Sequence, residues 1–411
     1  MSSILIKNVS IADAGSAHNG KVLDVLIENG SIRQLGVDLS SDTAQVINGK
    51  GKYISPGWIS LMTDFAEPGY EQKETIQSGL SAAAHGGFAE VVLVPNTNPA
   101  IANRSVAEFV QKAALGHRVG LKVMGAISQK LEGKALAEML EMYHGGAVAF
   151  TDGWQPVQNA GLLQKALEYV KAFDGVIVQV PVMASLADGL MNEGENSVRL
   201  GMPGIPNIAE TLMIHRDIEL ARYTDSHLHI SGVSTAEGLA MIKAAKADGL
   251  KVSCSVTPYH LLFTDDALSQ YDSLYKVNPP LRTEADRQAL LAGLADGTID
   301  CIAVHHRPQD WDAKTKEFEY AEPGMATMEV VWPMLLKAAP GIDATRWADL
   351  LSNNIARIFG WKPKGIEEGT TASFTLYDMN TEWTLTQAEA RSLAFNIPLL
   401  NASLVGKSVL I

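Results

Sequence analysis

The chain has 411 residues, 46% of them hydrophobic, and its 33 basic and 46 acidic side chains give a formal net charge of −13. This hydrophobic content is enough for a large core, and a single α/β barrel uses most of such a length. The acidic balance argues against nucleic acid and anionic membranes as partners, and no basic run interleaved with aromatic residues appears.

The sequence also bears on the compartment. Its start, Met-Ser-Ser-Ile-Leu-Ile-Lys, lacks the apolar core of a signal peptide, and no apolar run is long enough to span a bilayer. Cys254 and Cys301 both lie inside apolar runs, which predicts two buried free thiols rather than a disulfide or a metal pair. We therefore expect a cytoplasmic protein.

Both ends of the chain show β-strand patterns. Near the N-terminus, Asn29-Gly30 separates two short apolar runs and is a strong signal for a hairpin, so a small antiparallel sheet is expected there. Residues 372–378 and 392–411 are also typical of strands. A sheet this short is not stable alone, which predicts one small β-sandwich built from both termini.

The middle of the chain alternates apolar runs with helical patterns. The expected helices centre near residues 80, 110, 137, 165, 215, 242 and 290, and the eight candidate strands span 54–62, 88–94, 121–127, 147–151, 176–180, 227–231, 251–256 and 300–304. Eight such units predict a TIM-type (β/α)8 barrel, with a doubly wound open sheet as the alternative. No Gly-x-Gly-x-x-Gly turn follows a strand, which disfavours a dinucleotide fold.

This pattern predicts a division of the chain into domains. Residues 1–52 and 363–411 form the two parts of the composite β-sandwich, and residues 53–362 form the barrel. Three connections are unusually long, namely 181–206, 257–282 and 305–325. Long loops at the ends of barrel strands tend to carry function, so the site is expected there.

Several motifs resemble those of the dihydroorotases, the cyclic amidohydrolases of pyrimidine synthesis. They occur in the family's order along almost the whole chain, at residues 56–69, 94–99, 191–206, 257–262, 277–282, 297–308 and 392–398. The first of them begins with Pro56-Gly57 and ends with Glu67-Pro68-Gly69. The resemblance implies a barrel with a composite β-domain, a hydrolytic activity on cyclic amides, and zinc as the cofactor.

The residues that would carry this chemistry are mostly replaced. The family takes zinc ligands and its catalytic aspartate from strands one, four, five, six and eight, and a hydrolase needs such ligands to activate water. Only Asp152 matches them directly, and His305 stands at the position of the catalytic aspartate. In this sequence the corresponding positions hold Met62, Asp64, Asp152, Val180, Gly232 and His305. The sequence therefore predicts that the protein has no metal cofactor.

The substrate contacts survive in part. Asn96 and Asn278 match family residues that hydrogen-bond dihydroorotate, but both precede turns, so a structural role stays open for each. Ala66 replaces the arginine that grips the substrate carboxylate, and Gln309 replaces a histidine. Asp152, before Gly153, is favoured as a residue that holds the loop backbone.

Other histidines invite simpler interpretations. His229 and His260 are expected to be satisfied core residues, whereas residues 305–307, His-His-Arg, form the one local cationic cluster expected at the barrel mouth. This cluster predicts either an anion site or a contact with a partner.

The resulting hypothesis is a dihydroorotase-like protein of pyrimidine biosynthesis that is not catalytic. The resemblance suggests a structural role, as a homo-oligomer and as a partner of aspartate carbamoyltransferase. An active cyclic amidohydrolase with an atypical site using Asp64, Asp152 and His305 is one alternative. A protein that binds a small anion is the other.

Overall fold

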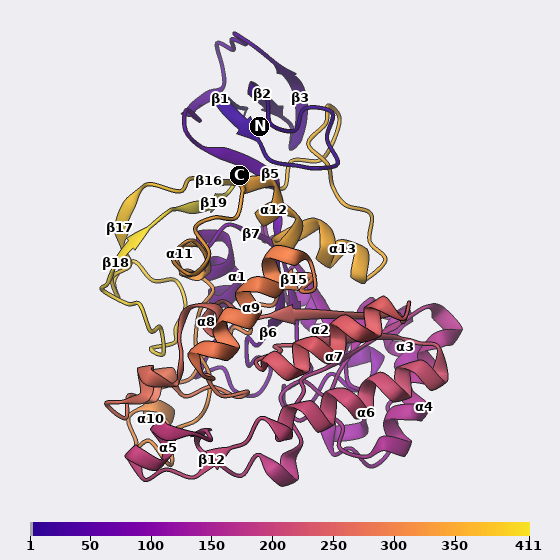
Figure 1. The fold of residues 1–411 in the computed structure, drawn as a ribbon. Coiled ribbons are helices and arrows are strands. Elements are labelled where there is room, and N and C mark those ends of the chain that lie inside the picture. Colours follow the sequence, from indigo (N-terminus) through magenta and orange to yellow (C-terminus); the bar gives the residue numbers. More distant parts are fainter. Residues whose placement is uncertain (1–2) are drawn as a thin grey trace.

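The computed structural model describes residues 3–411 and places a barrel of strands and helices below a small β-domain that holds the first and last strands (Figure 1). Within these residues, eight parallel strands lie side by side in the order β15-β14-β13-β10-β9-β8-β7-β6. Their bounds are β6 Trp58–Thr63, β7 Phe88–Leu93, β8 Gly120–Gly125, β9 Ala147–Phe150, β10 Val176–Gln179, β13 His227–Ser231, β14 Val252–Val256 and β15 Cys301–Ile302. The predicted (β/α)8 barrel is confirmed.

The barrel closes through the segment that follows β15. The N–H groups of Val304 and His305 donate to the carbonyl of Leu61, at 3.0 and 3.4 Å, and the N–H of Asp64 donates to the carbonyl of His306 at 2.9 Å. These bonds join the last strand region to the first. They bring Asp64 and His305, which are far apart in the sequence, to the same end of the barrel.

Helices surround the strands at the positions the sequence predicted. They are α1 Ile76–His85, α2 Arg104–Ala113, α3 Met139–His144, α4 Ala160–Val170, α6 Ile208–Thr224, α7 Ala236–Ala247, α9 Glu284–Asp296 and α11 Val331–Ala338. After α11, a continuous helical stretch contains α12 Ala344–Ala348, a π-helical turn at Asp349–Asn353 and α13 Asn354–Ile358. No helix within residues 3–411 is both long and apolar enough to cross a membrane.

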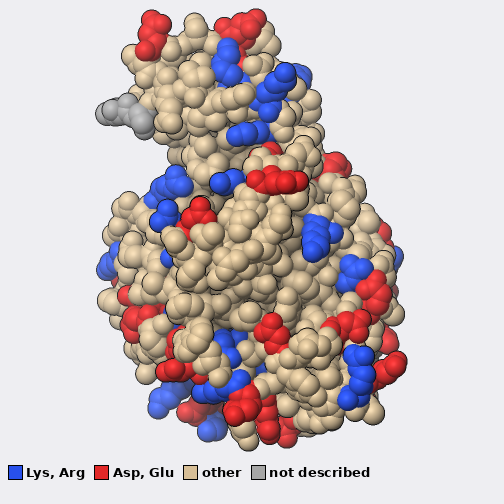
Figure 2. Space-filling view, turned by 90° about the vertical axis from the view of Figure 1, so that its left-hand side faces the viewer, with Lys and Arg blue, Asp and Glu red and all other residues tan. Residues whose placement is uncertain are grey.

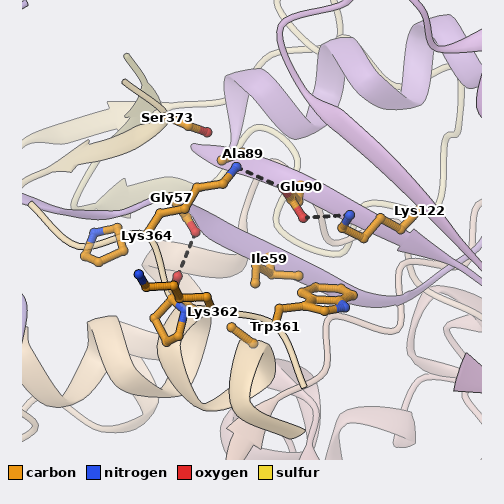
Figure 3. Close-up of a pocket in the computed structure, with 13 residues that line it drawn as sticks. Gly57, Ile59, Ala89, Glu90, Lys122, Trp361, Lys362, Lys364 and Ser373 are labelled. Carbon is orange, nitrogen blue, oxygen red and sulfur yellow. Dashed lines mark hydrogen bonds and ion pairs between the residues drawn. The ribbon is translucent and has the colours of Figure 1, made fainter. Parts of the chain in front are cut away.

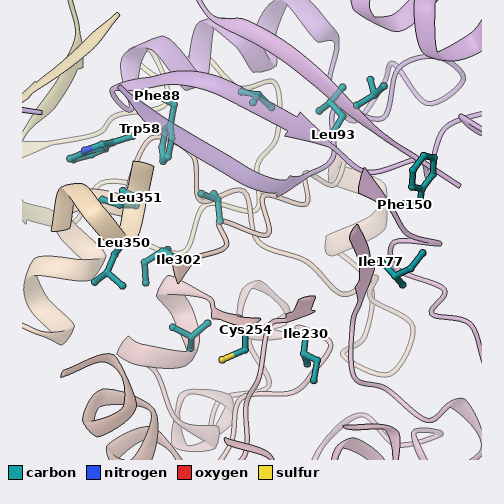
Figure 4. Close-up of a cluster of buried hydrophobic side chains, with 14 of the residues drawn as sticks. Trp58, Phe88, Leu93, Phe150, Ile177, Ile230, Cys254, Ile302, Leu350 and Leu351 are labelled. Atoms are coloured by element: carbon teal, nitrogen blue, oxygen red, sulfur yellow. The ribbon is translucent and has the colours of Figure 1, made fainter. Parts of the chain in front are cut away.

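The core has two layers. One layer fills the space between strands and helices and includes Trp58, Phe88, Phe150 and Leu351 (Figure 4). The other lies inside the barrel and includes Met62 and Val180. Cys254 and Cys301 are buried free thiols, as predicted.

The three long connections contain short elements of their own. Between β10 and α6 lie β11 Met191–Asn192, α5 Glu195–Leu200 and β12 Gly204–Ile205, between β14 and α9 lies α8 Pro258–Leu262, and after β15 comes α10 Trp311–Lys314. The buried guanidinium of Arg282 joins two of these loops, since Nη1 donates to Oδ1 of Asn192 at 3.0 Å and to the carbonyl of Ile205 at 2.8 Å. These loops are therefore packed parts of the fold.

The small β-domain combines both ends of the chain. Its strands are β1 Ile4–Ile11, β2 Val22–Glu28, β3 Ser31–Gly36, β4 Gln45–Asn48, β5 Tyr53–Pro56, β16 Phe374–Tyr377 and β19 Ser408–Leu410. β2 and β3 form the hairpin expected at Asn29-Gly30, but β1 pairs in parallel with β4 and β5, so the sheet is mixed rather than antiparallel as expected. The turns at residues 392–402 also correct the expected strand, since only β18 Ser403–Val405 and β19 are extended beyond them.

The expected first barrel strand, residues 54–62, is divided in two. β5 pairs with β1 and β16 in the β-domain, whereas β6 belongs to the barrel. Gly57 lies at the break because a Cβ atom there would come within 2.3 Å of the Cβ of Ala89 and 2.6 Å of the carbonyl oxygen of Ser373. One apolar run thus contributes a strand to each of two sheets. A hydrophobicity pattern alone does not show where the first strand ends and the second begins.

Candidate functional site

The first barrel strand ends in residues that are already engaged. The side chain of Met62 is fully buried inside the barrel. Asp64 accepts two hydrogen bonds, from the N–H of Ala66 to Oδ1 at 2.8 Å and from Nε1 of Trp154 to Oδ2 at 2.9 Å. A thioether in an apolar core and a carboxylate held by an indole make poor zinc ligands here.

Asp152, at the end of the fourth strand, holds a neighbouring loop. Its Oδ1 accepts the N–H groups of Ile127 and Ser128, both at 2.9 Å, and its Oδ2 accepts the hydroxyl of Ser128. Burial raises the pKa of Asp152 to about 6, although these hydrogen bonds act in the opposite direction. The favoured interpretation of Asp152 as a loop-holding residue is confirmed.

The ligand positions after the fifth, sixth and eighth barrel strands (β10, β13 and β15) hold only one imidazole. Val180 is buried inside the barrel, and Gly232 has no side chain. The ring of His305 takes up the space beside Gly232, because a Cβ atom added there would lie 2.6 Å from Cε1 of His305. Nε2 of His305 lies 2.9 Å from Oγ of Ser231, and burial lowers the pKa of His305 to about 3, so the ring is neutral.

These positions do not fit a zinc centre. Across residues 3–411, no three His, Cys, Asp or Glu side chains gather closely enough to hold a metal ion. The carboxylates of Asp64 and Asp152 are occupied by hydrogen bonds, and the imidazole of His305 faces Ser231. A zinc site needs several such ligands aimed at one point with an open position.

The expected cationic cluster at residues 305–307 is wrong for His305, because burial lowers the pKa of His305 to about 3. His305 and His306 are both buried. Nδ1 of His306 accepts the N–H of Met328 at 3.3 Å, and its Nε2 lies 3.8 Å from Oε2 of Glu74. Arg307 lines the mouth of the barrel, and its guanidinium carbon lies 5.1 Å from the ring centre of Trp154.

The two candidate substrate contacts differ in the structure. Nδ2 of Asn96 donates to the carbonyl of Asp152 at 3.2 Å, and its Oδ1 accepts the N–H of Trp154 at 3.3 Å, so Asn96 braces the loop after β9. Oδ1 of Asn278 is buried and has no hydrogen-bond partner among the described residues. Asn278 is therefore the freer of the two to contact a ligand.

His229 and His260 have hydrogen-bond partners, as expected. Nδ1 and Nε2 of His229 lie 2.8 and 3.0 Å from the hydroxyls of Ser253 and Ser255. Nδ1 of His260 lies 2.9 Å from Oγ1 of Thr257. Burial lowers the pKa of His229 to about 3 and that of His260 to about 4. Neither residue reaches the site as a proton donor at neutral pH.

Two cavities mark opposite ends of the barrel. At the carboxyl ends of the strands, a cavity of about 470 Å³ is lined by Asp64, Asn96, Trp154, Asn278, Arg307 and Gln309. A smaller cavity of about 140 Å³ lies at the other end, against the β-domain, among Gly57, Lys122 and Trp361 (Figure 3). Catalytic and binding groups of such barrels gather at the carboxyl ends, so the larger cavity is the candidate site.

Trp154 and Arg307 both line this cavity, and no sequence motif singles out either side chain on its own. Trp154 contacts Asp64 through its N–H, and its ring centre lies 5.3 Å from that of His305. The available signal was an aromatic residue directly after Asp152-Gly153 at a strand end. Arg307 was grouped with two histidines whose burial no local pattern reveals.

Comparison with solved structures defines the class. The L-hydantoinase of Arthrobacter aurescens superposes with a TM-score of 0.86 at 20% identity, covering 100% of this chain and 95% of that one. A D-hydantoinase gives a TM-score of 0.83 at 21% identity, covering 100% of this chain and 94% of that one. The barrel with its β-domain therefore has the same fold as these hydantoinases.

Comparison of sequences gives the family. The model described as dihydro-orotase-like matches residues 51–238. A dihydroorotase of Acetivibrio thermocellus is 36% identical over 98% of this chain and 96% of its own length, and one of Pelotomaculum thermopropionicum is 39% identical over 98% and 95%. The chain belongs to the dihydroorotase family, as the motifs predicted.

Proposed function

We propose that this chain is a dihydroorotase-like protein of pyrimidine biosynthesis that does not catalyse the family reaction and acts as a structural partner in the cytoplasm. Relatives named dihydroorotase align with this chain over 95–96% of their own length, which supports a role in pyrimidine biosynthesis. The main support for a loss of catalysis is which residues stand at the family's zinc-ligand positions. Two are apolar, one lacks a side chain, and Asp64 and Asp152 are held by other groups.

The chemistry supports the same conclusion. Hydrolysis of a cyclic amide needs an activated water and a polarised carbonyl, both of which zinc supplies when bound. Asp152 is fully buried, and its carboxylate holds a loop. His305 has a pKa of about 3, so it is too weak a base to take a proton from water near neutral pH. The alternative of an atypical catalytic site using these residues therefore has little physical support.

The proposed role is assembly. We propose a homodimer or larger complex, with aspartate carbamoyltransferase as the first partner to test. On the face shown in Figure 2, acidic and basic side chains are interspersed over the barrel. Such a mixed surface is compatible with a protein partner, and it lacks the basic field that nucleic acid requires.

Co-expression with aspartate carbamoyltransferase, followed by size-exclusion chromatography with light scattering, tests this role. We expect a joint peak and a gain in the thermal stability of the carbamoyltransferase. The control is the same carbamoyltransferase with an active dihydroorotase relative. A protein that stays monomeric and elutes apart from the carbamoyltransferase would contradict the proposal.

We also propose where the domains divide. Because β5 pairs with β1 and β16, the N-terminal part of the β-domain extends to residue 56, and the barrel begins at Gly57 rather than at residue 53. We propose no change at the other boundary. The barrel ends at residue 362, and residues 363–411 form the C-terminal part of the β-domain.

A further inference from the structure

A small cavity lies where the barrel meets the β-domain, at the end of the barrel opposite to the mouth (Figure 3). It is lined by residues near the amino ends of β6, β7 and β8, by the helical stretch that ends in α13, and by residues 361–364. Its volume is about 140 Å³. A cavity of about 150 Å³ with apolar walls binds one benzene molecule. The space therefore fits a single six-membered ring.

Small residues keep this space open. Gly57, Ala89 and Ala356 line it and carry little or no side chain. The indole of Trp361 also lines it, and Nζ of Lys122 lies 4.9 Å from the centre of that ring. This cation–π contact holds the indole in place, so the cavity has one aromatic wall.

The polar groups on the walls are bonded to one another. Oγ of Ser352 donates to the carbonyl of Gly57 at 2.9 Å, and the N–H of Gly57 donates to the carbonyl of Ser373 at 3.0 Å. A water molecule in a cavity needs about two to four polar partners, and the donors of these groups are already used. The interior therefore suits an apolar group better than water.

The rim of the cavity carries an excess of positive charge. Lys122, Lys362 and Lys364 line it together with one carboxylate, that of Glu90. Oε2 of Glu90 lies 3.9 Å from Nζ of Lys122, and its Oε1 lies 3.2 Å from Nζ of Lys364 (Figure 3). Lys362 is exposed and forms no ion pair with any residue in the part of the chain that the structure describes. On a chain with a formal net charge of −13, this rim is a local attractor for an anion.

We propose that this cavity binds a small aromatic carboxylate, with its ring inside against Trp361 and its carboxylate at the rim on Lys362 and Lys364. Removing the ring from water favours binding, and hydrogen bonds between ammonium and carboxylate groups fix its orientation. Ligand sites occur preferentially between domains, and this cavity joins the barrel to the β-domain. The site requires neither turnover nor a partner protein, so it goes beyond the function proposed above.

Ligand-observed NMR and calorimetry on the full chain test the site with four probes. Benzoate has both the ring and the charge, benzamide has the ring without the charge, acetate has the charge without the ring, and 1-naphthoate has two fused rings. We expect benzoate to bind one to one with a Kd below about 1 mM. Benzamide should bind about three- to tenfold more weakly, since exposed ion pairs contribute modestly. Acetate and 1-naphthoate should not bind.

Three outcomes with these probes would count against the proposal. Absence of saturable benzoate binding would overturn it. So would 1-naphthoate that binds as tightly as benzoate, because the site would then be an open surface rather than a cavity for one ring. Equal binding of benzoate and benzamide would overturn the assignment of an anionic ligand.

Filling the cavity tests the location. Ala356→Leu places a larger side chain in the wall, so the folded variant should lose benzoate binding. Thermal unfolding without ligand shows whether the variant folds, and saturating benzoate should raise the unfolding temperature of the wild type only. Benzoate binding that persists in the folded variant would locate the ligand elsewhere and overturn the proposal.

Charge variants test the rim even if the filled variant does not fold, because Lys362 and Lys364 are exposed. Lys362→Gln combined with Lys364→Gln should weaken benzoate binding about three- to tenfold and leave benzamide binding unchanged. The control is Lys165→Gln combined with Lys337→Gln, which removes two exposed cations that do not line the cavity and should change neither. Equal losses in the two double variants would show general charge attraction and overturn the assignment of the carboxylate to the rim.

Discussion

The indole N–H of Trp154 donates a 2.9 Å hydrogen bond to Oδ2 of Asp64, and this contact joins the ends of the first and fourth barrel strands. Trp154, after the fourth strand, thereby fixes the carboxylate of Asp64, which follows the first strand. The same ring lies beside His305 and under Arg307. The centre of the mouth is therefore organised around an aromatic ring.

Replacing this ring tests the contact. Trp154→Phe keeps an aromatic ring but removes the N–H, so it should lower the free energy of unfolding by about 1 kcal/mol, the loss of one hydrogen bond. Chemical denaturation measures it. Trp361→Phe is the control, because the indole N–H of Trp361 has no hydrogen-bond partner among residues 3–411. Equal effects of the two substitutions would contradict the role of the Trp154 N–H.

Gly232 and His305 should be energetically coupled. Gly232→Ala places a Cβ atom 2.6 Å from Cε1 of His305, at a residue with φ of +79°. We expect a loss of roughly 1–3 kcal/mol of stability from the overlap and the strained backbone. The double variant with His305→Ala should recover the part due to overlap, which a double-mutant cycle measures. Simple additivity of the two substitutions would show that the two positions do not compete for space.

Much of the fold was predictable because it depends on local and repeated patterns. Residues 88–93, 176–179 and 227–231 are strands where apolar runs predicted them, and the terminal runs meet in one β-domain. The break at Gly57 was missed because β5 and β6 are equally apolar, and only tertiary packing against Ala89 separates them.

The site was less predictable, since its character depends on burial and on contacts between distant residues. The absence of ligand side chains at Met62, Val180 and Gly232 follows directly from the sequence. The neutrality of His305 and the bond from Trp154 to Asp64 require residues more than 70 positions apart to meet. For that reason the sequence overestimates the charge of His305 and does not indicate the contact of Trp154 with Asp64.

Asp152 should matter for stability rather than for metal binding. Asp152→Ala leaves the N–H groups of Ile127 and Ser128 without their acceptor, at a cost of roughly 1–3 kcal/mol. Asp152→Asn retains an acceptor and should lose much less. Thermal unfolding and zinc analysis of both variants check this. A lower zinc content in Asp152→Ala than in the wild type would contradict the structural role.

Stability should fall in mild acid partly through His229. Its pKa is about 3 when folded and near 6.5 when unfolded, so the unfolded state binds more protons between these values. The stabilisation is complete above about pH 6.5 and is lost as the pH falls below it, by on the order of 2 kcal/mol at pH 5. The free energy of unfolding of His229→Gln should depend less on pH. His215→Gln, at the surface, should follow the wild type.

We expect the mouth of this barrel to lack the zinc-dependent chemistry of the family. The most direct measurement is the interconversion of dihydroorotate and carbamoyl-aspartate by protein expressed in zinc-supplemented medium, with zinc analysis of the same sample. We predict no stoichiometric zinc and no turnover above background. Two zinc ions per chain together with a kcat of about 1 s⁻¹ or more, abolished by Asp152→Ala, would contradict the account.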